Sequence, residues 1–282
     1  MKPKLSCTDV SFAKLSHDQA LGIISLLGFQ GVNIGLFEGY DHLKPSRELR
    51  QPTRSGAALK ARLDSHGLQA SDLFLQIHAS FEACAINHPE AKIRKFAREQ
   101  FTRGLDYTKA LGSEHLTILP GVAFKEMSRK DSLKLSADEL AWRIDAGKKV
   151  GIQVAVEPHV GSLVDTPERT LALTDLTPGL GLTLDYSHFT RAGIPDDRIE
   201  PLLAHATHLH ARSARRSRLQ CPLKENTIDF PRIVRFLAKR RFKGWIAIEY
   251  VWIDWEHCNE VDVISETVIL REQLLTAAKQ VP

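Results

Sequence analysis

GLTLDYSHFTRAG, residues 181–193, is the stretch from which the fold can be worked out. Small and apolar residues lead to Asp185, and His188 follows three positions later. A buried strand that delivers polar side chains at its C-terminal end has this pattern. An Asp after a strand is also a common start of a turn or a helix cap, so this segment alone is weak support for a site. Three other apolar runs end in the same way.

The segments on both sides of this stretch repeat an order of strand and then helix. Strands are predicted at 4–12, 30–39, 73–80, 115–121, 151–162, 181–189, 207–216 and 244–252. Helical patterns follow at 16–29, 55–67, 89–111, 136–151, from near 166, at 196–206, at 229–242 and at about 260–279. In the fourth of these helices, Ser136 and Glu139 have the spacing of a capping box. Eight such units predict an α/β fold, a single (β/α)8 TIM barrel, with residues 1–282 as one domain.

Composition narrows the class of protein. The chain has 282 residues, of which 43% are hydrophobic and 26% charged, as in ordinary globular proteins. The net charge of +4 is mild and spread along the chain, so no nucleic-acid partner is expected. No apolar run reaches 18 residues and the N-terminus lacks a signal-peptide core, so we expect a cytoplasmic protein without a membrane partner. The four cysteines form no CxxC pair, which argues against a disulfide framework.

Polar side chains end four successive predicted strands. Glu157, Asp185, His210 and Glu249 each follow a short apolar run, and neighbouring strands of a barrel bring their C-terminal ends together. Three carboxylates packed together repel one another unless a positive charge lies between them. The alternative for each residue alone is a helix cap, an ion pair or a turn. Four in succession favour one divalent ion, and this oxygen-rich set suits Mn²⁺, Co²⁺, Mg²⁺ or Zn²⁺.

The segments VEPHVGS, LDYSHF, HLHARSARR and IEY, in this order, carry a resemblance to a known family. They resemble the xylose-isomerase-like TIM-barrel superfamily of sugar (phosphate) isomerases and epimerases, to which endonuclease IV also belongs. The resemblance to its ketose 3-epimerase branch implies that Glu157, Asp185, His210 and Glu249 hold one metal ion and that the two glutamates form the acid–base pair. It also implies that His188 and Arg216, six residues after His210, contact the sugar.

The resemblance predicts a metal-dependent isomerase or epimerase. A metal ion that chelates a carbonyl and a neighbouring hydroxyl acidifies the adjacent C–H and stabilises the enediolate that forms. Glu157 and Glu249 would then exchange the proton from opposite sides of the substrate. Return of the proton to the other face gives an epimerase, and return to the neighbouring carbon gives an isomerase. The sequence leaves this choice open.

Further side chains are candidates for binding the substrate, which we expect to be a sugar, a sugar phosphate or a cyclitol. His159 follows Glu157 by two residues, and His78 ends the third predicted strand. The loop after His210 carries Arg212, Arg215, Arg216 and Arg218, which would suit a phosphate or a carboxylate. The alternative is a solvated basic loop, and the sequence does not choose which arginine reaches inward.

Three other functions compete with the isomerase or epimerase. A lyase of the inosose-dehydratase kind would share the single metal and the first proton abstraction. An endonuclease IV-like nuclease needs a three-metal cluster with extra histidines, whereas the fourth strand here ends in Leu119, Pro120 and Gly121, and Asp229 precedes Phe230 and Pro231. A sugar-binding protein without catalysis would not need two glutamates on a metal ion. A homo-oligomer is compatible with the sequence.

Overall fold

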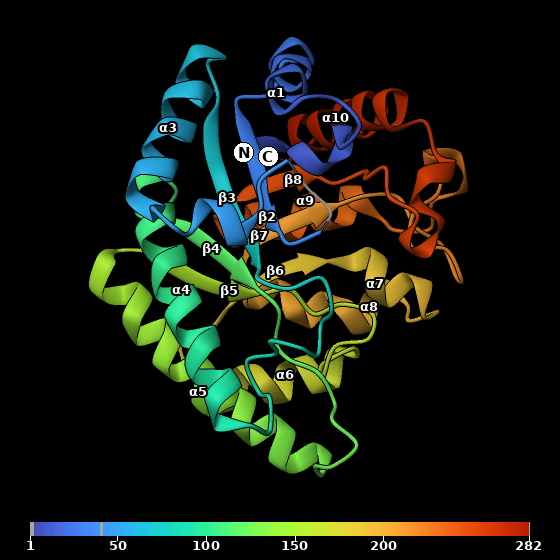
Figure 1. Cartoon of the computed structure of the whole chain (residues 1–282). Coiled ribbons are helices and arrows are strands. Elements are labelled where there is room, and N and C mark those ends of the chain that lie inside the picture. Colours follow the sequence, from blue (N-terminus) through green and yellow to red (C-terminus); the bar gives the residue numbers. More distant parts are fainter. Residues whose placement is uncertain (1–2, 40–41, 282) are drawn as a thin grey trace.

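Eight parallel strands close into a barrel in the order in which they occur along the chain (Figure 1). The computed structural model describes residues 3–39 and 42–281, while 1–2, 40–41 and 282 lie outside it. The strands are β1 (Lys4–Thr8), β2 (Gly31–Phe37), β3 (Gln69–Gln76), β4 (His115–Ile118), β5 (Gln153–Val156), β6 (Gly181–Asp185), β7 (Ala206–Ala211) and β8 (Trp245–Ile248). The predicted (β/α)8 barrel is confirmed.

Helices surround these strands (Figure 1). They are α1 (His17–Leu26), α2 (Pro45–Glu48), α3 (Pro52–Ser65), α4 (Ala91–Leu111), α5 (Arg129–Val150), α6 (Pro167–Leu176), α7 (Tyr186–Arg191), α8 (Asp196–Ile199), α9 (Phe230–Lys239) and α10 (Val263–Lys279). Short 3₁₀ turns are η1 (Asp9–Phe12), η2 (Glu200–Ala204), η3 (Leu223–Glu225) and η4 (Trp255–Glu260). Within the described ranges, no helix is both long and apolar enough to cross a membrane.

The predicted capping box of Ser136 and Glu139 is wrong, because α5 begins earlier in the chain. The helix begins at Arg129 after Ser128, whose side chain accepts the backbone N–H of Asp131, so it starts before the predicted 136–151 range. Ser136 lies inside the helix, where its hydroxyl donates to the carbonyl of Pro120 at 2.7 Å. Glu139 is also buried inside the helix, where it forms ion pairs with Arg94, Arg98 and Arg143. Both side chains have partners from outside their own turn, and the capping spacing was therefore coincidental.

All eight predicted strands run past the C-terminal ends of the observed strands, and two predicted elements also change type. The strand predicted at 4–12 ends at Thr8, and residues 9–12 form η1. The helix predicted at 196–206 is divided into α8 and η2, with Pro201 in the first turn of η2. Proline has no backbone N–H and cannot continue an α-helical ladder, which accounts for the change of helix type there.

Alternation along the strands separates the outer core from the barrel interior. On β6, Leu182 and Leu184 are fully buried, while Thr183 and Asp185 lie on the opposite face of the strand. Thr183 meets Thr117 of β4 across the interior, with the two hydroxyl oxygens 2.6 Å apart. Because side chains alternate along β6, the leucines face the outer helices and Asp185 points into the mouth of the barrel.

Candidate active site at the carboxyl ends of the strands

Four successive strands place the predicted ligands at one end of the barrel. Glu157 directly follows β5, Asp185 ends β6, His210 lies near the end of β7 and Glu249 directly follows β8; all four are buried. Asp185 and His210 are register partners in the ladder between β6 and β7. The backbone N–H of Glu249 donates to the carbonyl of Ala211. The sheet thus fixes the spacing of these backbones before any side chain interacts.

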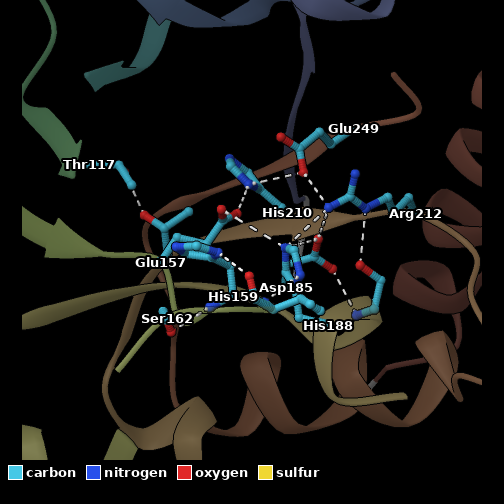
Figure 2. Close-up of polar contacts among 12 residues, drawn as sticks. Thr117, Glu157, His159, Ser162, Asp185, His188, His210, Arg212 and Glu249 are labelled. Atoms are coloured by element: carbon cyan, nitrogen blue, oxygen red, sulfur yellow. Dashed lines mark hydrogen bonds and ion pairs between the residues drawn. The ribbon is translucent and has the colours of Figure 1, made fainter. Parts of the chain in front are cut away.

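His210 is the centre of the cluster. Its Nδ1 lies 2.6 Å from Oε1 of Glu157 and 3.2 Å from Oε2 of Glu249 (Figure 2). Ligand atoms of these three residues all lie within 4.8 Å of one another. Oε2 of Glu249 is buried and makes no hydrogen bond within the described residues, only ion pairs with His210 at 3.2 Å and Arg212 at 3.4 Å. A cation held between buried carboxylates offsets their charge more directly than these longer contacts do. These three side chains therefore fit a divalent ion.

Asp185 binds an arginine instead of joining this group. Nη2 of Arg212 lies 2.7 Å from Oδ2 of Asp185 and 3.4 Å from Oε2 of Glu249, so the guanidinium stands between the two carboxylates (Figure 2). Nε of Arg212 donates to the hydroxyl of Ser187 at 3.0 Å. Asp185 belongs to an overlapping group in which its ligand atom lies within 4.8 Å of those of Glu157 and His188. Glu157 is thus common to both groups.

Burial and mutual charge shift the titration of these side chains in opposite directions. Burial raises the pKa of Glu157 above its ordinary range, although the charge of His210 opposes the rise. Burial also acts to raise the pKa of Glu249, but the positive charges of His210 and Arg212 outweigh it and hold this pKa low. The two carboxyl groups are therefore inequivalent, with the pKa of Glu157 raised and that of Glu249 lowered.

His188 and His159 are neutral side chains on the same cavity. Burial, with the charge of Arg212 added, keeps the pKa of His188 well below its usual value. The backbone N–H of Val160 donates to Nδ1 of His188, and Nε2 of the ring lies 3.2 Å from Nη2 of Arg212 and 3.6 Å from Oδ2 of Asp185. Burial lowers the pKa of His159 to about 4. Its Nδ1 donates to the carbonyl of Val160, which leaves Nε2 as a buried acceptor without a partner among the described residues.

The cavity above these side chains has a polar floor and largely apolar walls. Its volume is about 110 Å³, and Glu157, His188, Arg212 and Glu249 border it. The apolar lining residues are Val10, Phe37, Phe74, Ala79, Phe81, Leu119, Val251, Ile253 and Trp255. A larger cavity, of about 890 Å³, lies at the opposite end of the barrel among the strand starts, and none of the four predicted ligands lines it. The chemistry therefore belongs to the smaller cavity.

Two predicted substrate contacts lie elsewhere. Arg216 is exposed and lies beside Gly193, and His78 is exposed with its ring accepting the backbone N–H of Ser80. Neither lines the cavity. The arginines on either side of Arg216 also face outward: Arg215 pairs with Glu225 at 2.9 Å and Arg218 with Glu260 at 2.8 Å. Within the basic loop, the inward arginine is Arg212.

Sequence reasoning missed several side chains around the site. The phenylalanines of the wall come from β2, β3 and the loop after β3, which carry no polar motif. Asn33 of β2 was also overlooked, although it is buried and contacts His210. Arg212 was already a candidate, and strand spacing could have chosen it among the arginines: His208, His210 and Arg212 are two residues apart, and alternate residues of a strand share a face.

A model of the family described as xylose isomerase-like TIM barrel matches residues 22–272 of this sequence. The chain belongs to the xylose isomerase-like TIM-barrel family. The sequence of this chain is 23% identical over 225 residues to the rhizopine catabolism protein MocC of Rhizobium meliloti, and the match covers 70% of this chain and 67% of MocC.

Solved structures of similar proteins share the barrel of this xylose isomerase-like chain. D-psicose 3-epimerase from Clostridium cellulolyticum H10 matches with a TM-score of 0.75 and 15% identity, over 98% of this chain and 99% of that one. A structure of the IolI protein with a bound zinc atom matches with a TM-score of 0.73 and 15% identity, over 98% of each chain. At these identities the likeness shows a common fold.

Proposed function

We propose that this protein is a metal-dependent sugar epimerase or isomerase that removes and returns a proton beside a substrate carbonyl. The observation that carries the proposal is the pair of buried carboxylates, Glu157 and Glu249, which both contact Nδ1 of His210 and both border one cavity. Two carboxylates of unequal pKa on one cavity suit a reaction with two proton transfers. The epimerase and the zinc-bound protein of the same fold support this class of activity.

The ion would be held by Glu157, His210 and Glu249, with Asp185 as the fourth ligand once Arg212 releases it. When bound, Mn²⁺, Co²⁺, Mg²⁺ or Zn²⁺ would polarise the substrate carbonyl and acidify the neighbouring C–H. Glu157 and Glu249 each have a second oxygen with which to take or return the proton. His188 and the guanidinium of Arg212 would hold substrate oxygens on which negative charge develops. Nε2 of His159 would accept a substrate hydroxyl.

The charges around the cavity support an uncharged substrate. Three carboxylates, one guanidinium and a divalent ion sum to zero, which leaves no positive charge for a phosphate. Arg215 and Arg218, which the sequence offered as phosphate ligands, are paired with surface glutamates. The aromatic walls suit the apolar face of a neutral sugar or cyclitol. We therefore favour neutral ketoses and keto-cyclitols over sugar phosphates.

Two side chains argue against the nuclease alternative. Leu119 lines the cavity just after the end of β4, where the resemblance would require a histidine for a larger cluster. Asp229 is the N-cap of α9, and its side chain accepts the backbone N–H of Arg232. A three-metal site of the endonuclease IV kind would lack ligands at both positions.

Isotope exchange in D₂O tests the proposal. The Mn²⁺-loaded protein is incubated with neutral ketoses, keto-inositols and the matching sugar phosphates, and deuterium at the carbon beside the carbonyl is read by NMR. We expect exchange with a neutral compound, and a loss of about a hundredfold or more in the rate for Glu157→Gln and for Glu249→Gln. Each replacement keeps the shape of the side chain and removes its proton-carrying oxygen.

The products separate the remaining alternatives. Deuterium in an epimer or an aldose supports the proposal, whereas a dehydrated product assigns the lyase reaction to the same site. Arg216→Gln serves as the control, because this exposed side chain lies away from the cavity and should exchange at the wild-type rate. No exchange with any of these compounds would overturn the catalytic proposal and leave a sugar-binding role.

A further inference from the structure

Asn33 joins two histidines inside the barrel. It lies on β2, while His208 and His210 lie on β7, and these two strands are not neighbours in the sheet. Oδ1 of Asn33 lies 2.9 Å from Nε2 of His208 and 3.2 Å from Nε2 of His210. All three residues are almost completely buried. The contact therefore crosses the barrel interior, directly beneath the cluster formed by Glu157, His210 and Glu249.

The shared acceptor determines which nitrogen of His210 is available for a metal ion. A carbonyl oxygen accepts hydrogen bonds and cannot donate them, so Nε2 of each ring must carry a proton. In His210 this leaves Nδ1, which faces Glu157 at 2.6 Å and Glu249 at 3.2 Å, as the nitrogen at which a metal ion would replace a proton. His208 shares the same oxygen, and this second bond keeps the amide from rotating away.

We propose that Asn33 is a positioning residue of the metal centre, whose side-chain oxygen fixes the tautomer and the ring orientation of His210 so that Nδ1 faces the ion. The proposal rests on the proposed function, because it needs His210 to be a ligand. A histidine ligand that donates its other N–H to a fixed acceptor is oriented and made more basic. Without Asn33, the ring of His210 would be free to take the other tautomer, and metal affinity would fall.

Metal titration of three Asn33 variants tests this role. Asn33→Leu and Asn33→Ala remove the acceptor, the first with nearly the same volume, and we expect a Kd for Mn²⁺ that is about 10–100 times higher. Asn33→Asp keeps an acceptor for both N–H groups, and its affinity should return to within about threefold of wild type. A purely structural role would not predict this rescue. Calorimetry gives Kd, and circular dichroism verifies folding.

Thr117→Val is the matched control, because it removes a buried hydrogen bond in the same barrel interior without touching His210. Its Kd should be that of wild type. Folded Asn33→Leu and Asn33→Ala proteins with wild-type affinity would overturn the positioning role and leave the metal centre standing. A wild-type protein that binds no divalent ion would overturn the metal centre and the positioning role together.

A second readout needs no metal ion. In metal-free protein labelled with ¹⁵N-histidine, the Nε2–H of His210 should appear as a slowly exchanging ring proton, protected by its bond to Asn33. It should be lost or exchange at least about tenfold faster in Asn33→Leu, and unchanged in Thr117→Val. An equally protected ring proton in Asn33→Leu would contradict the proposal independently of any metal measurement.

Discussion

Arg212 is the cation that offsets the carboxylates of the site. Its guanidinium contacts Asp185 at 2.7 Å and Glu249 at 3.4 Å, and it is almost fully buried. A bound divalent ion would compete with it for both carboxylates. We expect Arg212→Met to bind Mn²⁺ about 10 to 150 times more tightly, because one charge-assisted bond of about 1.5–3 kcal/mol no longer has to be displaced. The same variant should lose exchange activity in D₂O, since the proposed mechanism also assigns substrate binding to Arg212.

Arg216→Met is the control for this effect. It removes an equal charge four residues away, from an exposed side chain outside the cavity. Surface charges contribute little through solvent, so both the Mn²⁺ affinity and the exchange rate should stay near the wild-type values. If Arg212→Met bound Mn²⁺ no better than Arg216→Met, the two cations would not be competing for the same carboxylates.

At the scale of the element, a buried ion pair joins α4 to α5. Glu139 receives two bonds from Arg98, at 2.9 and 3.0 Å, and one from Arg143 at 2.7 Å. Burial alone would raise the pKa of Glu139, but these arginines outweigh it and the pKa lies below its ordinary value. We expect Glu139→Gln to lower the free energy of unfolding at pH 7 by about 3 kcal/mol, because it leaves Arg143 buried without its counter-charge.

The pH dependence of this pair has a definite sign. A carboxyl group whose pKa is lower in the folded state stabilises the protein above its unfolded pKa, and this stabilisation is lost as the pH falls through the folded value. The difference in unfolding free energy between wild type and Glu139→Gln should therefore be constant near neutrality and shrink below about pH 4.5. Asp138→Asn, in an exposed pair with Lys134, should differ from wild type by less than about 1 kcal/mol. A gap that persists at low pH would contradict the assignment.

The elements also show which parts of the site the sequence could predict. The strand ends at Glu157, Asp185, His210 and Glu249 were predictable because apolar runs, parity and strand order all act locally. The start of α5 was not, because Ser136 and Glu139 match a local capping pattern while their actual partners, Pro120 and Arg98, are distant in the chain. The same holds for Asn33, whose significance depends on a contact between strands that are not neighbours.

The arginines show the limit of spacing as a guide. The resemblance placed a substrate contact at Arg216, yet the chain turns outward after the buried Ala214, and Ser217 adopts a left-handed backbone with a φ of 64°. A β-bridge between Arg215 and Arg218 holds this turn at the surface. The two-residue alternation of side chains along β7 predicts that Arg212 points inward, but it does not predict where the loop leaves the barrel. A loop conformation of this kind depends on partners such as Glu225 and Glu260.

For the whole molecule, the proposed metal centre spans half of a closed ring. Its ligands come from β5, β6, β7 and β8, and β8 pairs with β1 to complete the barrel. Unfolding would separate these strands and release the ion, so the ion should stabilise the folded chain as a unit. At a free Mn²⁺ concentration of about 100 times Kd, linkage predicts about 2.7 kcal/mol of added stability. For a chain of this size we expect Tm to rise by roughly 5–10 °C.

Calorimetric melting with Mn²⁺ or with a chelator measures this shift. Asp185→Asn keeps the shape of the side chain, and His210→Gln keeps a polar side chain without the imidazole; both should weaken binding, so their Tm should respond to Mn²⁺ only at higher concentrations. Arg216→Gln should show the full wild-type shift, since it leaves the four ligands intact. If the Tm of the wild-type protein did not change with Mn²⁺ at 100 times a measured Kd, the ion would bind the folded and the unfolded chain equally well. The binding site would then not depend on the closed barrel.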